Sequence, residues 1–145
     1  MRSTFALFRV GFGLQASGYG WQLVSRDPHK LKVFGLADEL VLETYQCTRG
    51  LPAEERFGLQ SQIRRAAVSV PTNIVEGCAR NSTRDYLHFM DVALASASEV
   101  RYLLGLSRRL RYMQPADAEA LESRYGELVR GLQKLLTALR TRPEA

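Results

Sequence analysis

Apolar residues recur every three or four positions along four stretches of the chain, which is the period of an amphipathic α-helix. These stretches span residues 30–48, about 53–78, about 83–112, and the segment that begins at Pro115. In the last segment the spacing continues without a fault through Ala118, Leu121, Tyr125, Leu128, Leu132, Leu135 and Leu139. Such a seam suits long helices that pack at a shallow angle.

Short polar connections separate the four stretches. Gly50 follows the first helix, and Pro52 opens the second at or near its first turn. Ser82 is a suitable N-cap for the third helix, and Asp85 three residues later forms a weak variant of the capping box. No stretch shows convincing strand alternation. We therefore predict an all-α protein in which residues 28–145 form an antiparallel up-down four-helix bundle.

The middle of the third predicted helix has unusually small side chains, in the run ALASASE. Small side chains let a neighbouring backbone approach closely. We expect the tightest contact between helices at this run.

Residues 1–27 differ from the rest of the chain. They are rich in glycine and aromatic residues, show no clear period, and end at Asp27-Pro28. A short apolar stretch after Arg2 faintly resembles a signal peptide, but Arg9 interrupts it and no convincing cleavage site follows. We predict a flexible or extended arm outside the bundle, and a cytoplasmic protein.

The second predicted helix contains a proline within the run RRAAVSVPTNIVEG, with core spacing on both sides of it. Pro71 lacks a backbone donor and its ring crowds the carbonyl four residues earlier, so we predict a kink there. Asn73 lies at the edge of the core stripe, where it can bond backbone groups that the kink frees. Glu76 is spaced for an ion pair with Arg80. We interpret Pro71, Asn73 and Glu76 as a structural kink and polar lock.

A second apolar face is predicted on the same helix. Phe57, Val68 and Val75 lie together roughly opposite the core stripe, at spacings of eleven and seven residues. Apolar residues on two faces of a helix indicate deep burial or contact with another chain. We predict that these three residues form an oligomer interface. The alternative is that the N-terminal arm folds over them.

The composition gives no sign of an enzyme. Cys47, Cys78 and the two histidines match no zinc spacing and no redox motif, so we expect reduced thiols and no metal or cofactor. A glycine-rich phosphate loop and the Glu-x-x-His pairs of di-metal bundles are both missing from the sequence. A packing or surface role suits His88 better than a general base. No apolar run reaches the roughly 18 residues that a membrane span requires.

The chain carries a net charge of +5 and a pI near 9.6, mostly through arginine. Such an excess permits contact with nucleic acid or another acidic partner without proving it. For Arg64 and Arg65 beside the proline, a structural role and a nucleic-acid contact both stay open.

Three runs of sequence resemble one known family: LKVFGLADELVLETYQCT, RFGLQSQIRRAAVSVPTNIVEGCAR and YLHFMDVALASASEV. It is a bacterial four-helix-bundle family that includes the proteins encoded within 23S rRNA intervening sequences. It also includes the accessory variability proteins of diversity-generating retroelements. The likeness covers roughly residues 29–115. It implies a barrel-like homopentamer and, for the retroelement branch, binding of nucleic acid and a reverse transcriptase through a positive surface.

We therefore expect a non-catalytic oligomeric adaptor that binds structured RNA or DNA, and the resemblance adds a reverse transcriptase as a candidate protein partner. The alternative is a protein-interaction scaffold without a nucleic-acid role, in which the arginines are a solvated surface. Binding through phosphate contacts would depend on salt and only weakly on sequence. The candidate contacts are Arg56, Arg64, Arg65, Arg80, Arg84, Arg101, Arg108, Arg109 and Arg111.

Overall fold

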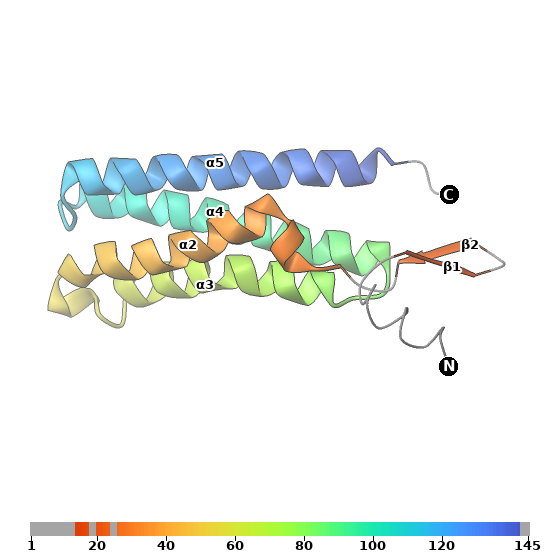
Figure 1. Cartoon of the computed structure of the whole chain (residues 1–145). Helices are drawn as coiled ribbons and strands as arrows, with labels where there is room; N and C mark the ends of the chain where they lie inside the picture. The colour runs from red at the N-terminus through yellow and green to blue at the C-terminus, as the bar shows by residue number, and fades with distance from the viewer. Residues whose placement is uncertain (1–13, 18–19, 24–25, 143–145) are drawn as a thin grey trace.

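The computed structural model of the chain describes residues 14–17, 20–23 and 26–142. Most of them form four long α-helices that lie side by side (Figure 1). Each helix packs against the next one in the sequence, and α2 also packs against α5. The predicted class, a bundle of four helices, is confirmed. The helices are α2 (Lys32–Cys47), α3 (Leu59–Cys78), α4 (Thr83–Arg109) and α5 (Pro115–Arg140).

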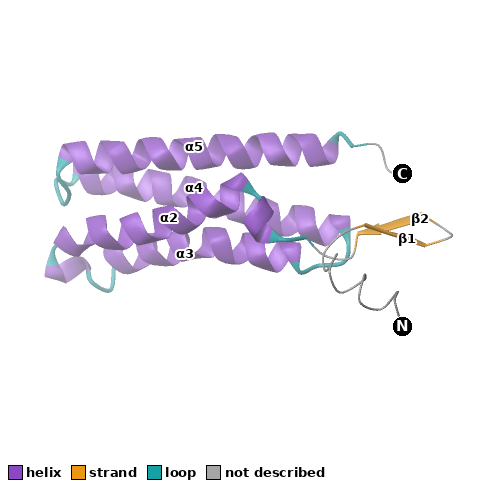
Figure 2. Ribbon diagram, in the orientation of Figure 1, coloured by secondary structure: helices purple, strands orange, loops and turns teal. Residues whose placement is uncertain are grey.

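A β-hairpin precedes the bundle, in the arm where the sequence shows no convincing strand alternation. Strand β1 (Leu14–Ser17) pairs antiparallel with β2 (Gly20–Leu23), with Leu14 opposite Leu23. Figure 2 shows the hairpin beyond one end of the helices. Alternation of apolar and polar residues marks a sheet that covers a core with one face. A hairpin outside the bundle does not need that pattern. The rest of the predicted arm, apart from Arg26 and Asp27, lies outside the described residues.

The arm joins the bundle at Arg26. Its backbone N–H donates to the carbonyl of Cys78 over 3.0 Å, and its guanidinium lies 3.8 Å from the centre of the Tyr86 ring. Burial lowers the pKa of Arg26, while the Tyr86 hydroxyl acts in the opposite direction. This contact holds the end of the arm against the end of α3 and the start of α4.

The start of α3 differs from the prediction. Residues 53–55 form a short 3₁₀ helix, a turn follows, and the α-helix begins only at Leu59. The reason is a side-chain cap: the Glu55 carboxylate accepts a hydrogen bond from the Leu59 N–H over 2.8 Å. Phe57 therefore lies on a turn, and its predicted helical spacing from Val68 is wrong.

The other helix boundaries are close to the predicted ones. Ser82 caps α4 as predicted, because its hydroxyl accepts a hydrogen bond from the Asp85 N–H over 3.0 Å. The helix ends at Arg109, three residues earlier than expected. Arg111 has a left-handed backbone with φ of 62°, which turns the chain toward α5. Two further 3₁₀ helices flank α2, at Pro28–Lys30 and Thr48–Gly50.

Helix α3 continues through Pro71 without a break in its assignment, and Pro71 is buried. Polar side chains give extra hydrogen bonds to backbone carbonyls beside it. Thr72 donates to the carbonyl of Val68 over 2.7 Å, and Asn73 donates to the carbonyl of Ser69 over 2.7 Å. These bonds support the helix around the missing donor of the proline.

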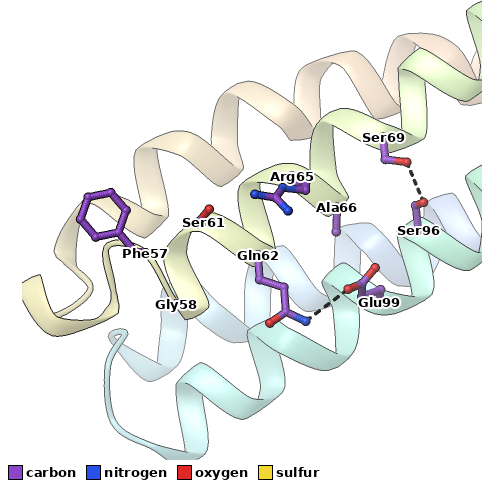
Figure 3. Close-up of a pocket in the computed structure, with 9 residues that line it drawn as sticks. All are labelled: Phe57, Gly58, Ser61, Gln62, Arg65, Ala66, Ser69, Ser96 and Glu99. Atoms are coloured by element: carbon purple, nitrogen blue, oxygen red, sulfur yellow. Dashed lines mark hydrogen bonds between the residues drawn. The ribbon is translucent and has the colours of Figure 1, made fainter.

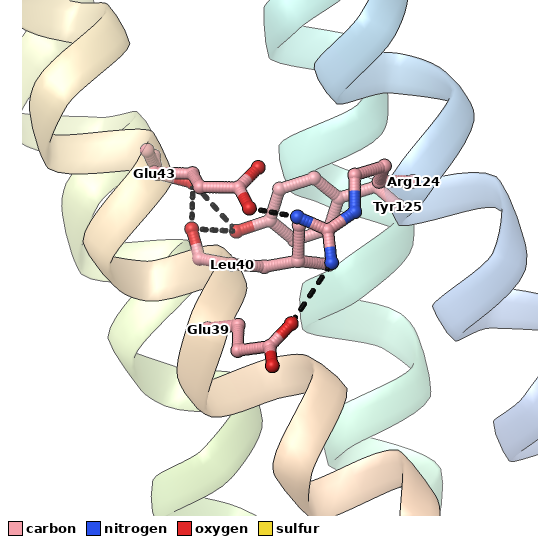
Figure 4. Close-up of polar contacts among 6 residues, drawn as sticks. Glu39, Leu40, Glu43, Arg124 and Tyr125 are labelled. Atoms are coloured by element: carbon pink, nitrogen blue, oxygen red, sulfur yellow. Dashed lines mark hydrogen bonds and ion pairs between the residues drawn. The ribbon is translucent and has the colours of Figure 1, made fainter.

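The core is apolar, with one buried polar contact between α2 and α5. The Tyr125 and Thr44 hydroxyls lie 2.8 Å apart, and Thr44 also donates to the Leu40 carbonyl over 2.6 Å. Above this contact Arg124 forms ion pairs with Glu39, over 3.0 Å, and with Glu43 (Figure 4). The buried bond and the outer ion pairs together hold one register of α5 against α2.

We predict that the Tyr125→Phe variant loses less stability than the wild type as the pH rises above 10. Burial raises the pKa of Tyr125 from 10.0 to about 12, although the Thr44 hydrogen bond acts in the opposite direction. The unfolded chain releases this proton first, so the stability that the group contributes is complete below pH 10 and is lost as the pH rises toward 12. In urea unfolding, the variant's free energy of unfolding should fall less steeply, by about 1.4 kcal/mol per pH unit in this window.

Tyr102→Phe is the matched control, because this ring is 61% exposed. It should keep the wild-type slope. Equal slopes for wild type and Tyr125→Phe would contradict the role given to the buried hydroxyl.

Candidate nucleic-acid interface

The nine candidate arginines do not gather on one surface of the chain. They lie on the turn before α3, on the first half of α3, on the connection from α3 to α4, on both halves of α4, and on the connection to α5. Four of them are engaged within the chain: Arg64, Arg80, Arg108, and Arg109, whose Nε donates to the Gly105 carbonyl over 3.3 Å. The other five are exposed, and no ion pair joins them to an acid in the part of the chain that the structure describes: Arg56, Arg65, Arg84, Arg101 and Arg111.

Arg64 ties α3 to the end of α2. Its Nε donates to the Thr48 hydroxyl over 2.9 Å, and its Nη2 donates to the Tyr45 carbonyl over 3.1 Å. The guanidinium also lies 4.6 Å from the centre of the Tyr45 ring, at cation–π distance. Carbonyls at a helix C-terminus lack partners inside the helix, so Arg64 satisfies groups that α2 leaves open. The geometry supports the structural alternative for this residue.

Two other arginines form ion pairs with acids. Arg80 pairs with Glu76 over 3.0 Å, at the spacing that the sequence predicts, and lies over the Phe89 ring. Arg108 of α4 pairs with Glu122 of α5 over 2.9 Å, and this hydrogen bond raises the pKa of the guanidinium. Both pairs reduce the positive charge available to a partner.

Arg65 borders a groove between α3 and α4 (Figure 3). The groove has a volume of about 560 Å³, and Phe57 lies at one end of it. Its floor is crossed by two polar contacts: Gln62 donates to Glu99 over 3.4 Å, and the Ser69 and Ser96 hydroxyls lie 2.9 Å apart. The acid Glu99 shares the groove with Arg65, so the groove is polar without a large excess of one sign.

The predicted interface residues are exposed in the single chain. The exposed fractions are 91% for Phe57, 39% for Val68 and 45% for Val75. Helix α2 adds Leu42 and Tyr45, which are 65% and 41% exposed and which the sequence analysis missed. The pattern could have revealed Leu42, because it lies opposite the core stripe of α2. Exposed apolar side chains on neighbouring helices are the usual mark of a contact surface.

Thiol and metal chemistry find no support in the described residues. Cys78 is buried, and burial raises the pKa of its thiol to about 11. Cys47 is half-buried, and burial likewise raises its pKa. Within residues 14–17, 20–23 and 26–142, no three His, Cys, Asp or Glu side chains cluster as metal ligands would. Nor does any helix in these ranges have the length and apolar character to cross a membrane.

Comparison with known proteins gives a family and a fold. Residues 29–134 match the family model of the 23S rRNA-intervening sequence protein. A crystal structure of a protein of unknown function from the S23 ribosomal protein family of Bacteroides thetaiotaomicron superposes with a TM-score of 0.67. The two sequences are 24% identical, and the match covers 72% of this chain and 95% of that chain. No curated protein matches.

We predict that Arg64→Lys destabilises the protein while the neighbouring Arg65→Lys does not. Lysine keeps the charge, but it lacks the planar guanidinium that donates to both the Thr48 hydroxyl and the Tyr45 carbonyl. The loss of one of these hydrogen bonds should lower the free energy of unfolding by about 1–2 kcal/mol. Urea unfolding of both variants measures the difference, and equal effects would show that Arg64 is not a structural tie.

Proposed function

Because the chain belongs to the 23S rRNA-intervening sequence protein family, we propose that it is a non-catalytic adaptor that binds structured RNA or DNA as a homo-oligomer. Its subunit is an up-down bundle that is bent at Pro71. The observation that carries the nucleic-acid role is the set of exposed arginines without an acid partner among the described residues. Such groups neutralise phosphates at little cost, since they break no ion pair on binding.

The assembly is a barrel-like pentamer, as the family resemblance implies. Exposed Val68 and Val75 on α3, with Leu42 and Tyr45 on α2, support a contact between subunits. Repetition around a ring would bring arginines of five chains together, which the single chain does not do. A reverse transcriptase is the protein partner that the resemblance to retroelement accessory proteins suggests, and the cytoplasm is the compartment.

A protein-interaction scaffold is the second candidate. The pairs Arg80–Glu76 and Arg108–Glu122 favour it, because in them acids of the same chain neutralise part of the positive charge. The contacts of Arg64 act in the same direction. The scaffold needs the apolar face but none of the exposed arginines.

We expect light scattering of the purified protein to give the mass of a pentamer, and Val75→Glu to reduce it. The introduced carboxylate would be buried at the contact, and the free-energy cost of burying an unpaired charge exceeds the stabilisation that the contact provides. Ala120→Glu is the control, because Ala120 is exposed on α5.

Pro71→Ala should change the assembly as well, since it restores a backbone donor and removes the bend. A monomeric wild type would contradict the oligomer, and an unchanged mass and melting temperature of Pro71→Ala would contradict the bend.

Binding of a structured RNA should weaken as salt rises, because each neutralised phosphate releases counterions. Replacing Arg56, Arg65 and Arg84 together by glutamine should lower the affinity at low salt. It should also reduce the slope of log affinity against log salt by the amount expected for about three phosphate contacts. The control is Arg80→Gln with Glu76→Gln, which removes an ion pair without changing the net charge. A protein that forms the oligomer and ignores RNA at low salt would leave the scaffold as the function.

A further inference from the structure

Two arginines from different helices converge over a buried glycine where α4 packs against α5. A Cβ placed on Gly126 would lie 3.3 Å from Nη1 of Arg130 and 3.4 Å from Cζ of Arg101. The two guanidinium groups therefore share one small space above the α5 backbone. An alanine at position 126 would touch both groups, and Arg130 would have to shift by a few tenths of an ångström.

A neighbouring contact on the same pair of helices is built differently. There a Cβ on Gly105 would lie 2.8 Å from Oε1 of Glu122, and Glu122 pairs with Arg108. A carboxylate that is paired with an arginine thus lies at Gly105, whereas two cations meet at Gly126. No ion pair reaches Arg101 or Arg130 from the acids of the described ranges.

The surroundings add positive charge to this place. Lys134 follows Arg130 by one helical turn, and both line a shallow hollow of about 400 Å³ with Gln133. Glu127 is the acid nearest to Arg130 along α5, and it forms no ion pair with it in the structure. Arg101 and Arg130 are both exposed, so a solute can reach them.

Like charges that share a small space repel each other, and an anion between them turns the repulsion into two attractions. Guanidinium forks match the oxygens of a phosphate in geometry as well as in charge. We propose that Arg101 and Arg130 form a binding site for one phosphate group, with Lys134 at its edge. Gly126 makes the site possible because it leaves room for both side chains.

The phosphate can come from two sources, a nucleic-acid backbone or free inorganic phosphate. The site is independent of the oligomer and of the adaptor function. It follows only from the convergence of the two side chains.

The test is a titration of the nitrogen-15-labelled protein with inorganic phosphate at constant ionic strength, with chloride as the exchanged ion. The Nε–H signals of Arg101 and Arg130 should shift together and saturate, whereas the signal of Arg84 should not. Arg101→Gln with Arg130→Gln should weaken binding at least about tenfold, the loss of one or two charge-assisted hydrogen bonds. Gly126→Ala should also weaken binding without a change of charge.

Arg84→Gln is the matched control, since Arg84 is exposed and lies outside the site. Circular dichroism checks that each variant is folded. Signals of Arg101 and Arg130 that drift like that of Arg84, or an affinity that the double variant leaves unchanged, would overturn the site.

A second titration with a short structured RNA identifies the source. Shifts of the same two signals at low RNA concentration, lost in the double variant, support the site with a backbone phosphate as its ligand. Saturation by inorganic phosphate without any response to RNA supports the site with free phosphate, and contradicts the adaptor function. RNA binding that the double variant retains in full, with no phosphate saturation, overturns the site and leaves the adaptor function intact.

Discussion

The close approach of α3 and α4 is the constraint on which the rest of the structure depends. Small buried side chains meet along this seam, with Ala66 and Ala67 on α3 and Ala93 and Ala97 on α4. Of all pairs of helices in the described residues, these two pack most extensively. Small buried residues let the two backbones pack closely in the core. A rigid pair of helices results, and α2 and α5 complete the bundle beside it.

The same seam shapes the outer surface. Because α3 buries one side toward the bundle, Val68 and Val75 lie on its other side and stay 39% and 45% exposed among the described residues. Where the side chains of α3 and α4 stay short near Ser69 and Ser96, the surface is hollowed into the groove of Figure 3. The features that a partner could use are therefore consequences of how the core is packed.

Positive charge in this protein has two different uses. Arg64 and Arg108 hold helices together through oxygen acceptors of the same chain. Exposed arginines such as Arg101 keep their donors for a partner. Net charge alone does not separate these uses, since each arginine contributes equally to it. The position of each guanidinium relative to carbonyls and carboxylates separates them.

Local spacing in the sequence determined the four helices, the Ser82 cap and the Glu76–Arg80 pair, because each depends on residues within one or two turns. The β-hairpin and the late start of α3, which leaves Phe57 on a turn, depend on local hydrogen bonds that a pattern of apolar residues does not show. Tertiary structure alone decided the contacts of Arg64 with α2. It alone brought Arg130, which sequence reasoning missed, beside Arg101. Both of these contacts between helices depend on a partner that packing places nearby although it lies far along the chain. A periodic pattern of apolar residues carries no information about such partners.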